Sequence, residues 1–415
     1  MRPTNRLDVL WHDGRVVAEL LHTGPIYFRY TPQWLATGHN LSPLTLPFDT
    51  RTVNAHTTED KVPGLVADAL PDKWGRTVAQ TVFAKLGLGQ PTTFKLLAWK
   101  GIRGIGALGF RPSLDLKTAT PTANRVYAAA LEREARAVLQ GELDYVIDNF
   151  TAGPTGGGAY PKILVAATAD NSLRVRGDPN PKPGETLCIL KLDAEGRNPL
   201  PAEQAYLDMA AMAGITVPRA RILSDENGKK HLLIERFDVR PDGTRIHVHS
   251  LSGLLGSRRD GFDYSDLFSA ITRLACPRAD LLQAVRRLLF NLLAGNQDDH
   301  EKNHAFVYSE QTRSWRLAPA FDLTHTPGLQ RGLRIGGEVV PEWAHLKKWL
   351  TNGGLTSEEI EEAYDAVQSA LHAWPDLAAR NEVPANQTTA IAATHRNIAR
   401  QMSGYSQIRR IIGRG

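Results

Sequence analysis

The sequence predicts an α+β fold in which small sheets dominate the N-terminal half of the chain and helices dominate the C-terminal half. Residues 6–22 alternate apolar and polar side chains around a His-Asp-Gly turn, which is typical of paired antiparallel strands. Glycine-rich turns and further strand-like runs continue to about residue 240. Beyond that point apolar residues return every three or four positions, as they do over residues 281–293, and this spacing indicates helices.

The composition is that of a globular protein of moderate charge. At 415 residues, with 42% hydrophobic and 22% charged residues, the chain is long enough for about two or three domains. A formal charge of +5 allows a basic patch without establishing nucleic-acid binding. Only two cysteines, Cys188 and Cys276, are present, which favours a reducing, cytoplasmic location. The N-terminus has no apolar signal region, and no apolar run approaches eighteen residues, so neither secretion nor membrane insertion is expected.

The first module is expected to span residues 1–114. A third strand over residues 24–36 should follow the first two. Residues 65–89 are predicted to form a helical stretch that a glycine closes. A glycine-rich turn, a short strand and a proline exit then lead to Leu114.

The second module is expected to span residues 115–240. A helix over residues 126–150 should precede a glycine-rich loop, two strands, and a buried strand that ends at Lys191. Glu203 lies in the first turn of the helix that follows. A hairpin over Asn227 and Gly228 then ends near Glu235.

The third module, residues 241–415, is expected to be mainly helical. Gly295 suits the C-cap of the helix that precedes it. Thr356 and Glu359 have the spacing of a capping box at the start of another helix. From Ile391 to the C-terminus the chain has five arginines and no acidic residue, which is typical of a solvated helical tail.

The polar stretch GNQDDHEKN, residues 295–303, carries the strongest chemical signal. By itself such a stretch is more often a solvated turn. Asp298, however, precedes Asn303 by five residues, and an apparent strand, turn and strand then lead to Asp322. Protein kinases place a catalytic aspartate, a metal-binding asparagine and a second metal-binding aspartate in this order.

Upstream segments supply the other parts that phosphoryl transfer needs. Lys191 and Glu203 could form the ion pair that positions a phosphate-contacting lysine. Gly157 and Gly158 could bring backbone N–H groups close to phosphates, and Lys162 would add a positive charge. Each signal is weak alone, because a glycine run is often a flexible linker and a lysine at a strand end is often only solvated.

Nearly the whole chain resembles the HipA-type serine/threonine kinases, the toxin components of bacterial toxin–antitoxin modules. The resemblance is carried in family order by ALPDKWGR, GIRGIGALGF, GGGAYPK, ILKL, AEQAYLDMAAMAGITVP, IERFD, GNQDDHEKN and LAPAFDLT. It implies a two-lobed protein-kinase-like fold with an additional β-rich module at the N-terminus.

The resemblance also implies residue roles. Asp298 resembles the catalytic aspartate, and Asn303 and Asp322 resemble the Mg²⁺ ligands. The residues expected to contact ATP are Gly157, Gly158, Lys162, Lys191, Glu203, Glu235 and Phe237, of which Glu235 and Phe237 match the adenine-contacting hinge.

Three positions depart from the family pattern. Thr155 stands where many members have an autophosphorylated serine, so it is the candidate for self-phosphorylation here. Asp299 replaces a smaller residue, and it is expected either to help recruit metal or to face solvent. The segment that contains His247 and His249 also differs from the family sequence. The two histidines alternate along a strand, so both rings could lie on one face and bind zinc.

The expected reaction is transfer of the γ-phosphoryl group of ATP to a protein serine or threonine with Mg²⁺. The resemblance further implies a target in translation, such as an aminoacyl-tRNA synthetase, and a helix-turn-helix antitoxin of HipB type. Contact with DNA would then be mainly indirect, through the antitoxin. Two alternatives are a small-molecule kinase and a catalytically silent corepressor that only binds the antitoxin.

Overall fold

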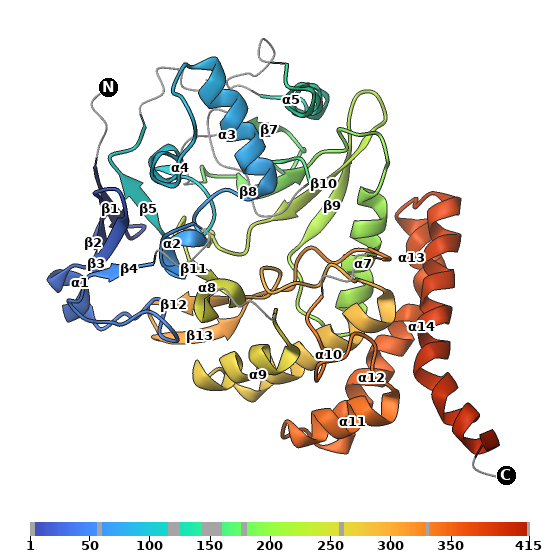
Figure 1. Cartoon of the computed structure of the whole chain (residues 1–415). Coiled ribbons are helices and arrows are strands. Elements are labelled where there is room, and N and C mark those ends of the chain that lie inside the picture. Colours follow the sequence, from blue (N-terminus) through green and yellow to red (C-terminus); the bar gives the residue numbers. More distant parts are fainter. Residues whose placement is uncertain are drawn as a thin grey trace. The chain divides into compact units, whose positions relative to one another are not determined.

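The computed structural model divides the chain into two compact units (Figure 1). It describes residues 5–55, 60–114, 125–142, 160–175, 181–256, 261–328 and 332–412, with side chains as far as residue 402. Unit 1 comprises Met1–Leu200, Arg219–Ser257 and Val307–Arg313. Unit 2 comprises Pro201–Pro218, Arg258–Phe306 and Ser314–Gly415. Among the described residues, no helix combines the length and the apolar character that crossing a membrane requires.

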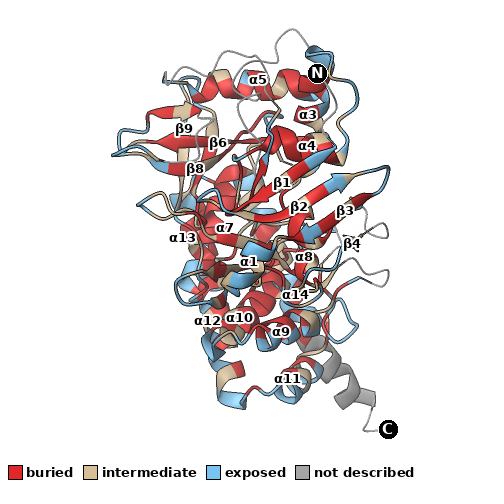
Figure 2. Ribbon diagram, turned by 90° about the vertical axis from the view of Figure 1, so that its left-hand side faces the viewer, coloured by how far each residue is buried: buried red, intermediate tan, exposed pale blue. Residues whose placement is uncertain are grey.

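The first sheet of unit 1 has five antiparallel strands in the order β4-β3-β2-β1-β5. Its strands are β1 (Arg6–Leu10), β2 (Val16–His22), β3 (Ile26–Tyr30), β4 (Val53–Asn54) and β5 (Gly109–Arg111). These segments form strands because apolar and polar side chains alternate along them, so that Leu7 and Val9 are buried on one face of the sheet. Figure 2 shows buried positions, in red, running through β1 and β2. The expected hairpin of β1 and β2 is confirmed.

Helices in this part of the chain begin where proline and capping residues allow them. They are α1 (Pro32–Thr37), α2 (Gly64–Ala67), α3 (Lys73–Lys85) and α4 (Thr93–Lys100). The expectation that the third strand continues to residue 36 is wrong, because Thr31 caps α1 and Pro32 occupies its first turn. The helical stretch expected over residues 65–89 is confirmed, but it is divided into α2 and α3. Pro71 lies between α2 and α3, and Asp72 caps the second of them by accepting from Gly75 N at 2.7 Å.

The second sheet of unit 1 is also antiparallel, with the order β7-β6-β8-β10-β9. Its strands are β6 (Lys162–Ala167), β7 (Leu173–Val175), β8 (Thr186–Lys191), β9 (Ala220–Ser224) and β10 (Lys230–Glu235). The predicted hairpin over Asn227 and Gly228 is confirmed, and Gly228 has a φ of 77° that favours glycine. The buried strand predicted to end at Lys191 is β8.

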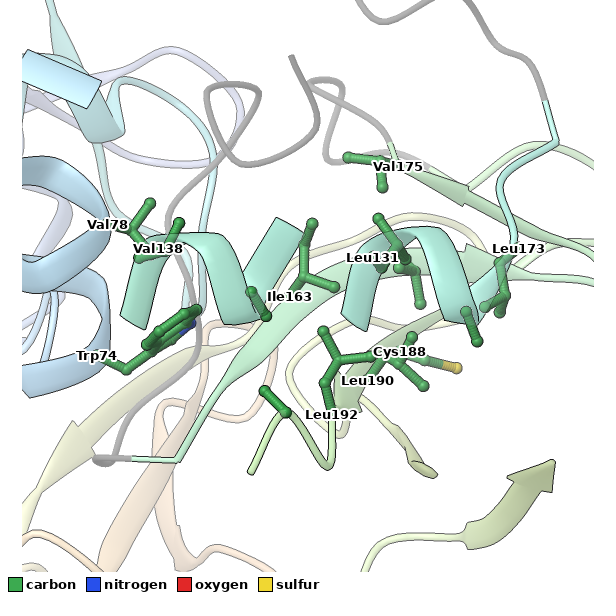
Figure 3. Packing of buried hydrophobic residues seen from close by; sticks show 14 of the residues in the cluster. Trp74, Val78, Leu131, Val138, Ile163, Leu173, Val175, Cys188, Leu190 and Leu192 are labelled. Carbon is green, nitrogen blue, oxygen red and sulfur yellow. The ribbon is translucent and has the colours of Figure 1, made fainter. Parts of the chain in front are cut away.

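Two helices cover one face of the second sheet and form a hydrophobic core with it (Figure 3). Trp74 of α3 and Leu131 of α5 (Ala128–Gln140) pack with Ile163 of β6 and Leu190 of β8. Burial of each such side chain stabilises the fold by about 1.5–3 kcal/mol. The indole Nε1 of Trp74 also donates to the carbonyl of Lys162 at 2.8 Å, so α3 is fixed to the first residue of β6. Unit 1 further contains β11 (His247–Ser250) and α8 (Leu251–Leu255).

Unit 2 is built around α10, which contacts α9, α12 and α14. Its elements are α7 (Leu200–Met212), α9 (Tyr264–Arg273), α10 (Arg278–Ala294), β13 (Ser314–Leu317), α11 (Trp343–Asn352), α12 (Ser357–His372), α13 (Trp374–Arg380) and α14 (Ala385–Ile412), while β12 (Ala305–Ser309) begins in it. The C-cap at Gly295, with a φ of 74°, and the capping box of Thr356 and Glu359 are confirmed. The expectation of a solvated tail is wrong for one face of α14, because Ile391, Ile398 and Met402 are buried.

Candidate active site

Hydrogen bonds between its own residues fix the shape of the loop that connects α10 to β12. The amide N of Asn303 donates to His300 O at 2.8 Å, and the amide N of His300 donates to Asp298 O at 3.0 Å. The side-chain Nδ2 of Asn303 donates to the same Asp298 carbonyl at 3.0 Å. The five-residue spacing therefore folds back on itself and brings Asp298 and Asn303 together, as the sequence predicts. His300 lies at the turn, where its ring Nδ1 accepts from Lys302 N at 3.3 Å.

Thr326 holds the start of this loop through several hydrogen bonds. Its hydroxyl oxygen accepts from the amides of Gln297 and Asp298 at 2.9 and 3.0 Å, and it donates to Asn296 Oδ1 at 3.2 Å. The amide N of Thr326 donates to Gly295 O at 3.2 Å. One threonine thus holds the backbone of Gly295, Gln297 and Asp298 and the side chain of Asn296. The sequence gives no signal for this role, since isolated threonines are common in loops.

The carboxylate of Asp298 has one oxygen without a partner. Its Oδ1 is buried and accepts no hydrogen bond from any residue that the structure describes. A buried acceptor left in this state costs about 1–3 kcal/mol, so binding of a donor or a cation to it would be favourable. The backbone on both sides of Asp298 is held firmly, and the oxygen is therefore presented in a fixed position to an incoming hydroxyl group or cation.

Asp322 adopts a backbone conformation that is rare for its residue type. Its φ is 53°, in the left-handed region that favours glycine. Strain of this kind, on the order of 1–3 kcal/mol, is found preferentially at functional sites. The chain that leaves Asp322 reaches Thr326 four residues later, and Thr326 holds the loop of Asp298. Asp322 and the candidate catalytic loop therefore both belong to unit 2, and a short segment connects Asp322 to the residue that holds this loop.

The residues present fit a magnesium site that is completed by phosphate and water. Asn303 and Asp322 offer the oxygen ligands that Mg²⁺ prefers, and Mg²⁺ commonly uses only one or two protein groups beside substrate phosphates. The described histidine, cysteine, aspartate and glutamate side chains form no group of three that could hold a metal by themselves. The orphaned Asp298 oxygen lies in the same loop as Asn303.

Asp299 has a structural role that differs from both expectations for it. Only 5% of Asp299 is exposed, and its Oδ1 pairs with His304 Nε2 at 2.7 Å. Its Oδ2 accepts from the hydroxyl of Tyr264, which also accepts from Asn291 Nδ2 at 3.3 Å. Burial together with the charge of Asp299 raises the pKa of Tyr264 well above its usual value. Because both carboxylate oxygens are used inside the fold, Asp299 neither faces solvent nor is available to recruit metal.

Lys162 and Lys191 lie side by side in the second sheet. They are directly opposed in the antiparallel pairing of β6 with β8, so their side chains leave the same face. Both are buried, and the Nζ of Lys162 lies 3.7 Å from Asp72 Oδ2. Two like charges directly opposed destabilise a sheet unless an anion lies near them, and Asp72 is such an anion beside Lys162. The structure thus brings together the two lysines that the sequence predicts to contact phosphate, and that role stays a prediction.

Glu235 is the last residue of β10 and Phe237 follows it, so their role as an adenine-contacting hinge stays a prediction. Glu235 is opposite Cys188, and its amide N donates to Arg219 O at 2.8 Å. Phe237 follows in the connection and is half-buried. Glu203 lies in the first turn of α7, which unit 2 contains from Pro201 onward, whereas Lys191 belongs to unit 1. The Lys191–Glu203 ion pair therefore stays a prediction. Thr155, Gly157 and Gly158 lie outside the described residues.

A buried salt bridge just after β10 connects the end of this strand to the glycine-rich segment of residues 101–108. Arg236 makes a two-point contact with Asp238, at 2.9 and 2.7 Å, and donates to Gly104 O at 2.8 Å. Asp238 Oδ2 also accepts from Gly106 N at 2.7 Å. Burial alone would raise the pKa of Asp238, but the charge of Arg236 holds it below its usual value.

A second arginine completes this contact. Arg245 donates to Ile102 O and Gly104 O, both at 2.6 Å. Burial and the charge of Arg236 lower the pKa of Arg245 to about 10, so it stays protonated at neutral pH. Neither Arg236 nor Arg245 was singled out by the sequence pattern. The available signal was IERFD, whose arginine and second acidic residue form the salt bridge.

Comparison with known protein families finds matches over both halves of the chain. Residues 7–111 match the HipA N-terminal domain. Residues 155–374 match the HipA-like C-terminal domain. The second match contains every catalytic, metal-binding and nucleotide-binding residue considered above.

Individual relatives agree with these domain matches. Y4mE of Sinorhizobium fredii, which carries a provisional kinase name, is 26% identical over 379 residues, covering 84% of this chain and 85% of that protein. The serine/threonine-protein kinase toxin HipA of Shewanella oneidensis is 25% identical over 305 residues, covering 67% and 65% of the two chains. A solved structure of Shewanella oneidensis HipA with HipB and operator DNA has a TM-score of 0.67, 18% identity, and coverage of 96% and 97%. The last of these matches shows the fold.

Proposed function

Because the chain belongs to the HipA-like family, whose N-terminal and C-terminal domains together match most of its length, we propose that it is a protein kinase. It would use ATP and Mg²⁺ to phosphorylate serine or threonine hydroxyl groups. The observation that carries this proposal is the loop of Asp298, where a rigid backbone presents a buried carboxylate oxygen that has no partner among the described residues.

Asp298 would orient the attacking hydroxyl group and accept its proton. As the substrate oxygen forms its bond to the γ-phosphorus, the bond from that phosphorus to the β,γ-bridging oxygen breaks and ADP leaves. Asn303 and Asp322 would hold Mg²⁺, which supplies electrostatic stabilisation of the phosphate charge. The reaction then depends mainly on position and electrostatics, which suits a loop held at Thr326.

The nucleotide would bind mainly to residues of unit 1. The opposed ammonium groups of Lys162 and Lys191 suit the phosphates, and Glu203 would pair with Lys191. The backbone at Glu235 and Phe237 would meet the adenine edge. Gly157 and Gly158 would contribute backbone N–H groups to the phosphates, and Thr155 would be the site of self-phosphorylation.

The family also gives a biological context for the proposal. HipA of Shewanella oneidensis has been solved together with HipB and operator DNA. We propose that this chain is likewise a toxin that binds a helix-turn-helix antitoxin of HipB type and contacts DNA mainly through it. The phosphorylated target would be a protein of translation, such as an aminoacyl-tRNA synthetase.

The decisive experiment compares Asp298→Asn with Glu301→Gln in a transfer assay with labelled ATP and Mg²⁺. Both changes remove one negative charge from the same loop, but only Asp298 has an assigned role. Loss of the base should lower transfer to protein by about 10²–10⁴-fold in Asp298→Asn, while Glu301→Gln should stay within about twofold of the natural protein. Binding of ATP should persist in both variants.

Other outcomes would contradict parts of the proposal. Equal labelling by the two variants would remove Asp298 from the mechanism. Binding of ATP without any transfer would favour a silent corepressor, and transfer only to small hydroxyl compounds would favour a small-molecule kinase. Self-labelling that persists in Thr155→Ala would place the autophosphorylated residue elsewhere.

A further inference from the structure

The C-terminal helix α14 contacts the region of the candidate catalytic loop, although no residue of α14 has a role in the proposed reaction. α14 packs against α10 and α13 in unit 2 (Figure 1). Its apolar residues Ile391, Ile398 and Met402 are buried. Thr394 and His395 lie between these positions, and both reach the end of α10, where the loop of Asp298 begins.

Gly295 lies directly against α14. It ends α10 and begins the loop, and its φ is 74°. A Cβ atom on Gly295 would lie 2.6 Å from Thr394 Cγ2 and 3.5 Å from Ile398 Cδ1. The first of these distances is too short for two carbon atoms, so only glycine permits so close an approach. The start of the loop and the side chain of Thr394 are therefore packed against each other.

Thr394 also binds the segment that follows Asp322. Its hydroxyl donates to Ala390 O at 3.2 Å, one turn earlier in α14, and its oxygen lies 2.9 Å from His325 Nε2. Burial lowers the pKa of His325, so the ring is neutral at neutral pH and has one N–H group. Because the proton of the threonine is directed to Ala390 O, His325 Nε2 is the donor in this contact.

His325 connects this contact to Asp298 through the next residue in the chain. Thr326 follows His325, and its hydroxyl oxygen accepts from the amides of Gln297 and Asp298 at 2.9 and 3.0 Å. A shift of His325 would displace Thr326 and weaken these two hydrogen bonds. Only His325 and Thr326 thus separate Thr394 from the proposed base.

His395 gives α14 a second contact with the end of α10. The hydroxyl of Tyr206 donates to Ala294 O at 2.6 Å and lies 3.3 Å from His395 Nε2. Since the single hydroxyl proton is directed to Ala294 O, the ring of His395 is the donor to Tyr206. Burial and the charge of His325 lower the pKa of His395 to about 4, so this ring is also neutral at neutral pH. α14 therefore supports the loop where it leaves α10 and where Thr326 holds it.

We propose that α14 positions the candidate catalytic loop, with Thr394 acting on Asp298 through His325 and Thr326. The effect on catalysis rests on the proposed kinase function, whereas the physical link between α14 and the loop does not. Phosphoryl transfer depends on the exact position of the base, so a change that draws α14 away from α10 lowers the rate without touching the nucleotide or Mg²⁺ residues. α14 is therefore an element through which activity can be regulated.

Thr394 permits a substitution that removes the contact and preserves the size of the side chain. Thr394→Val has nearly the same shape but cannot accept from His325, whereas Thr394→Ser keeps the hydroxyl group. The matched control is Thr389→Val. Thr389 is an exposed residue of the same helix, and its hydroxyl donates to Ala385 O at 2.9 Å, one turn earlier, as that of Thr394 does.

The first measurement is hydrogen exchange in the absence of nucleotide. The amides of Gln297 and Asp298 should exchange at least about tenfold faster in Thr394→Val, because Thr326 then holds them less firmly, while exchange in the β6–β8 pair stays unchanged. Thr394→Ser and Thr389→Val should remain within about twofold of the natural protein. Unchanged exchange in Thr394→Val would overturn the proposal, whether or not the protein is a kinase.

The second measurement is transfer from labelled ATP, at a temperature where all variants are folded. In Thr394→Val, kcat should fall about tenfold or more while KM for ATP stays within about twofold, and Thr394→Ser should recover most of the loss. Thr389→Val should match the natural protein. Adding Thr394→Val to His325→Leu should lower kcat no further, because the contact is already absent.

These results separate the inference from the proposed function. Faster exchange in Thr394→Val together with no transfer by the natural protein would reject the kinase proposal and leave the support of the loop by α14 in place. Faster exchange with an unchanged kcat would overturn the role of Thr394 in positioning Asp298. Independent, multiplying losses in the double variant would overturn the path through His325.

Discussion

At the scale of single residues, the candidate catalytic loop is held in place by the side chain of Asp299, whose role the sequence does not reveal. Asp299 follows the proposed base directly and uses both carboxylate oxygens inside unit 2, toward His304 and Tyr264. The amide N of Leu333 also donates to Asp299 O at 2.7 Å. A charged residue beside a catalytic aspartate could equally face metal, solvent or the interior, and only the fold decides among these. We therefore expect Asp299 to position Asp298.

Asp299→Asn should reduce catalysis while leaving nucleotide binding nearly intact. The amide retains one acceptor, but its nitrogen cannot accept from His304 or Tyr264, so the loop should lose part of its fixed geometry at a cost of about 1–3 kcal/mol in stability. We expect kcat to fall about tenfold or more with KM for ATP within about twofold, measured at a temperature where the variant stays folded. A fall in stability with an unchanged kcat would make the role of Asp299 purely structural.

His247 should make the stability of unit 1 depend on pH. Its ring Nε2 donates to Leu41 O at 3.0 Å, and burial, with the charge of His249, lowers its pKa to about 3. The unfolded chain takes up a proton near pH 6.5, whereas the folded chain does not until about pH 3. Stability is therefore fully present above pH 6.5 and decreases as the pH falls, by about 2 kcal/mol at pH 5.

His247→Gln keeps a donor for Leu41 O and removes this titration. Its free energy of unfolding, measured with denaturant from pH 7.5 to pH 5, should decline less than that of the natural protein, by about 2 kcal/mol at the acidic end. The exposed His372→Gln should follow the natural profile. Parallel profiles for all three proteins would show that His247 does not titrate in this range.

At the scale of elements, local signals were sufficient wherever one short segment determines the conformation. The capping box of Thr356 and Glu359, the turn at Asn227 and Gly228, and the helix end at Gly295 each depend on a few neighbouring residues. Predictions failed where packing decides the outcome. The apolar face of α14 is buried because α10 lies against it, and no local property of an arginine-rich sequence reports that contact.

Two short helices of unit 1 approach so closely that only glycine fits between them. A Cβ atom on Gly64 of α2 would lie 2.0 Å from Gly253 O of α8. A Cβ atom on Gly253 would lie 2.4 Å from Asp68 Oδ2 and 2.6 Å from His249 Cε1. Asp68 and His249 pair at 2.5 Å, so a methyl group at this position would have to displace an ion pair.

Gly253→Ala should therefore destabilise unit 1 by about 3 kcal/mol, although alanine ordinarily favours helices over glycine. The neighbouring Ser252→Ala, in the same helix, should change stability by less than about 0.5 kcal/mol. Thermal unfolding of the two variants is the measurement. A Gly253→Ala protein as stable as the natural one would mean that α2 and α8 are not in the close contact described.

At the scale of the whole molecule, the order of the candidate catalytic residues can be read from the sequence, but the contacts that hold them cannot. Asp298 and Asn303 lie in one loop, and Asp322 follows after the strands β12 and β13. The spacing of these three residues along the sequence is therefore enough to recognise them. The contact of Arg236 and Gly104 joins positions 132 residues apart. Its acceptor is a backbone carbonyl, which every residue possesses, so no sequence pattern marks it.

The buried salt bridge of Arg236 and Asp238 joins the glycine-rich segment of residues 101–108 to the end of β10, because Arg236 donates to Gly104 O and Asp238 accepts from Gly106 N. Asp238→Asn would leave the buried guanidinium groups of Arg236 and Arg245 without their counter-charge, and removing one partner of a buried pair costs about 3–5 kcal/mol. Hydrogen exchange should accelerate in β5 and at the end of β10, next to the broken contact, before it changes in the β6–β8 pair.

The matched control is Asp242→Asn, because Asp242 is an exposed turn residue in the same connection. Uniform acceleration through both sheets would mean that the salt bridge supports unit 1 as a whole, and equal exchange in the two variants would mean that the hinge is held by other contacts.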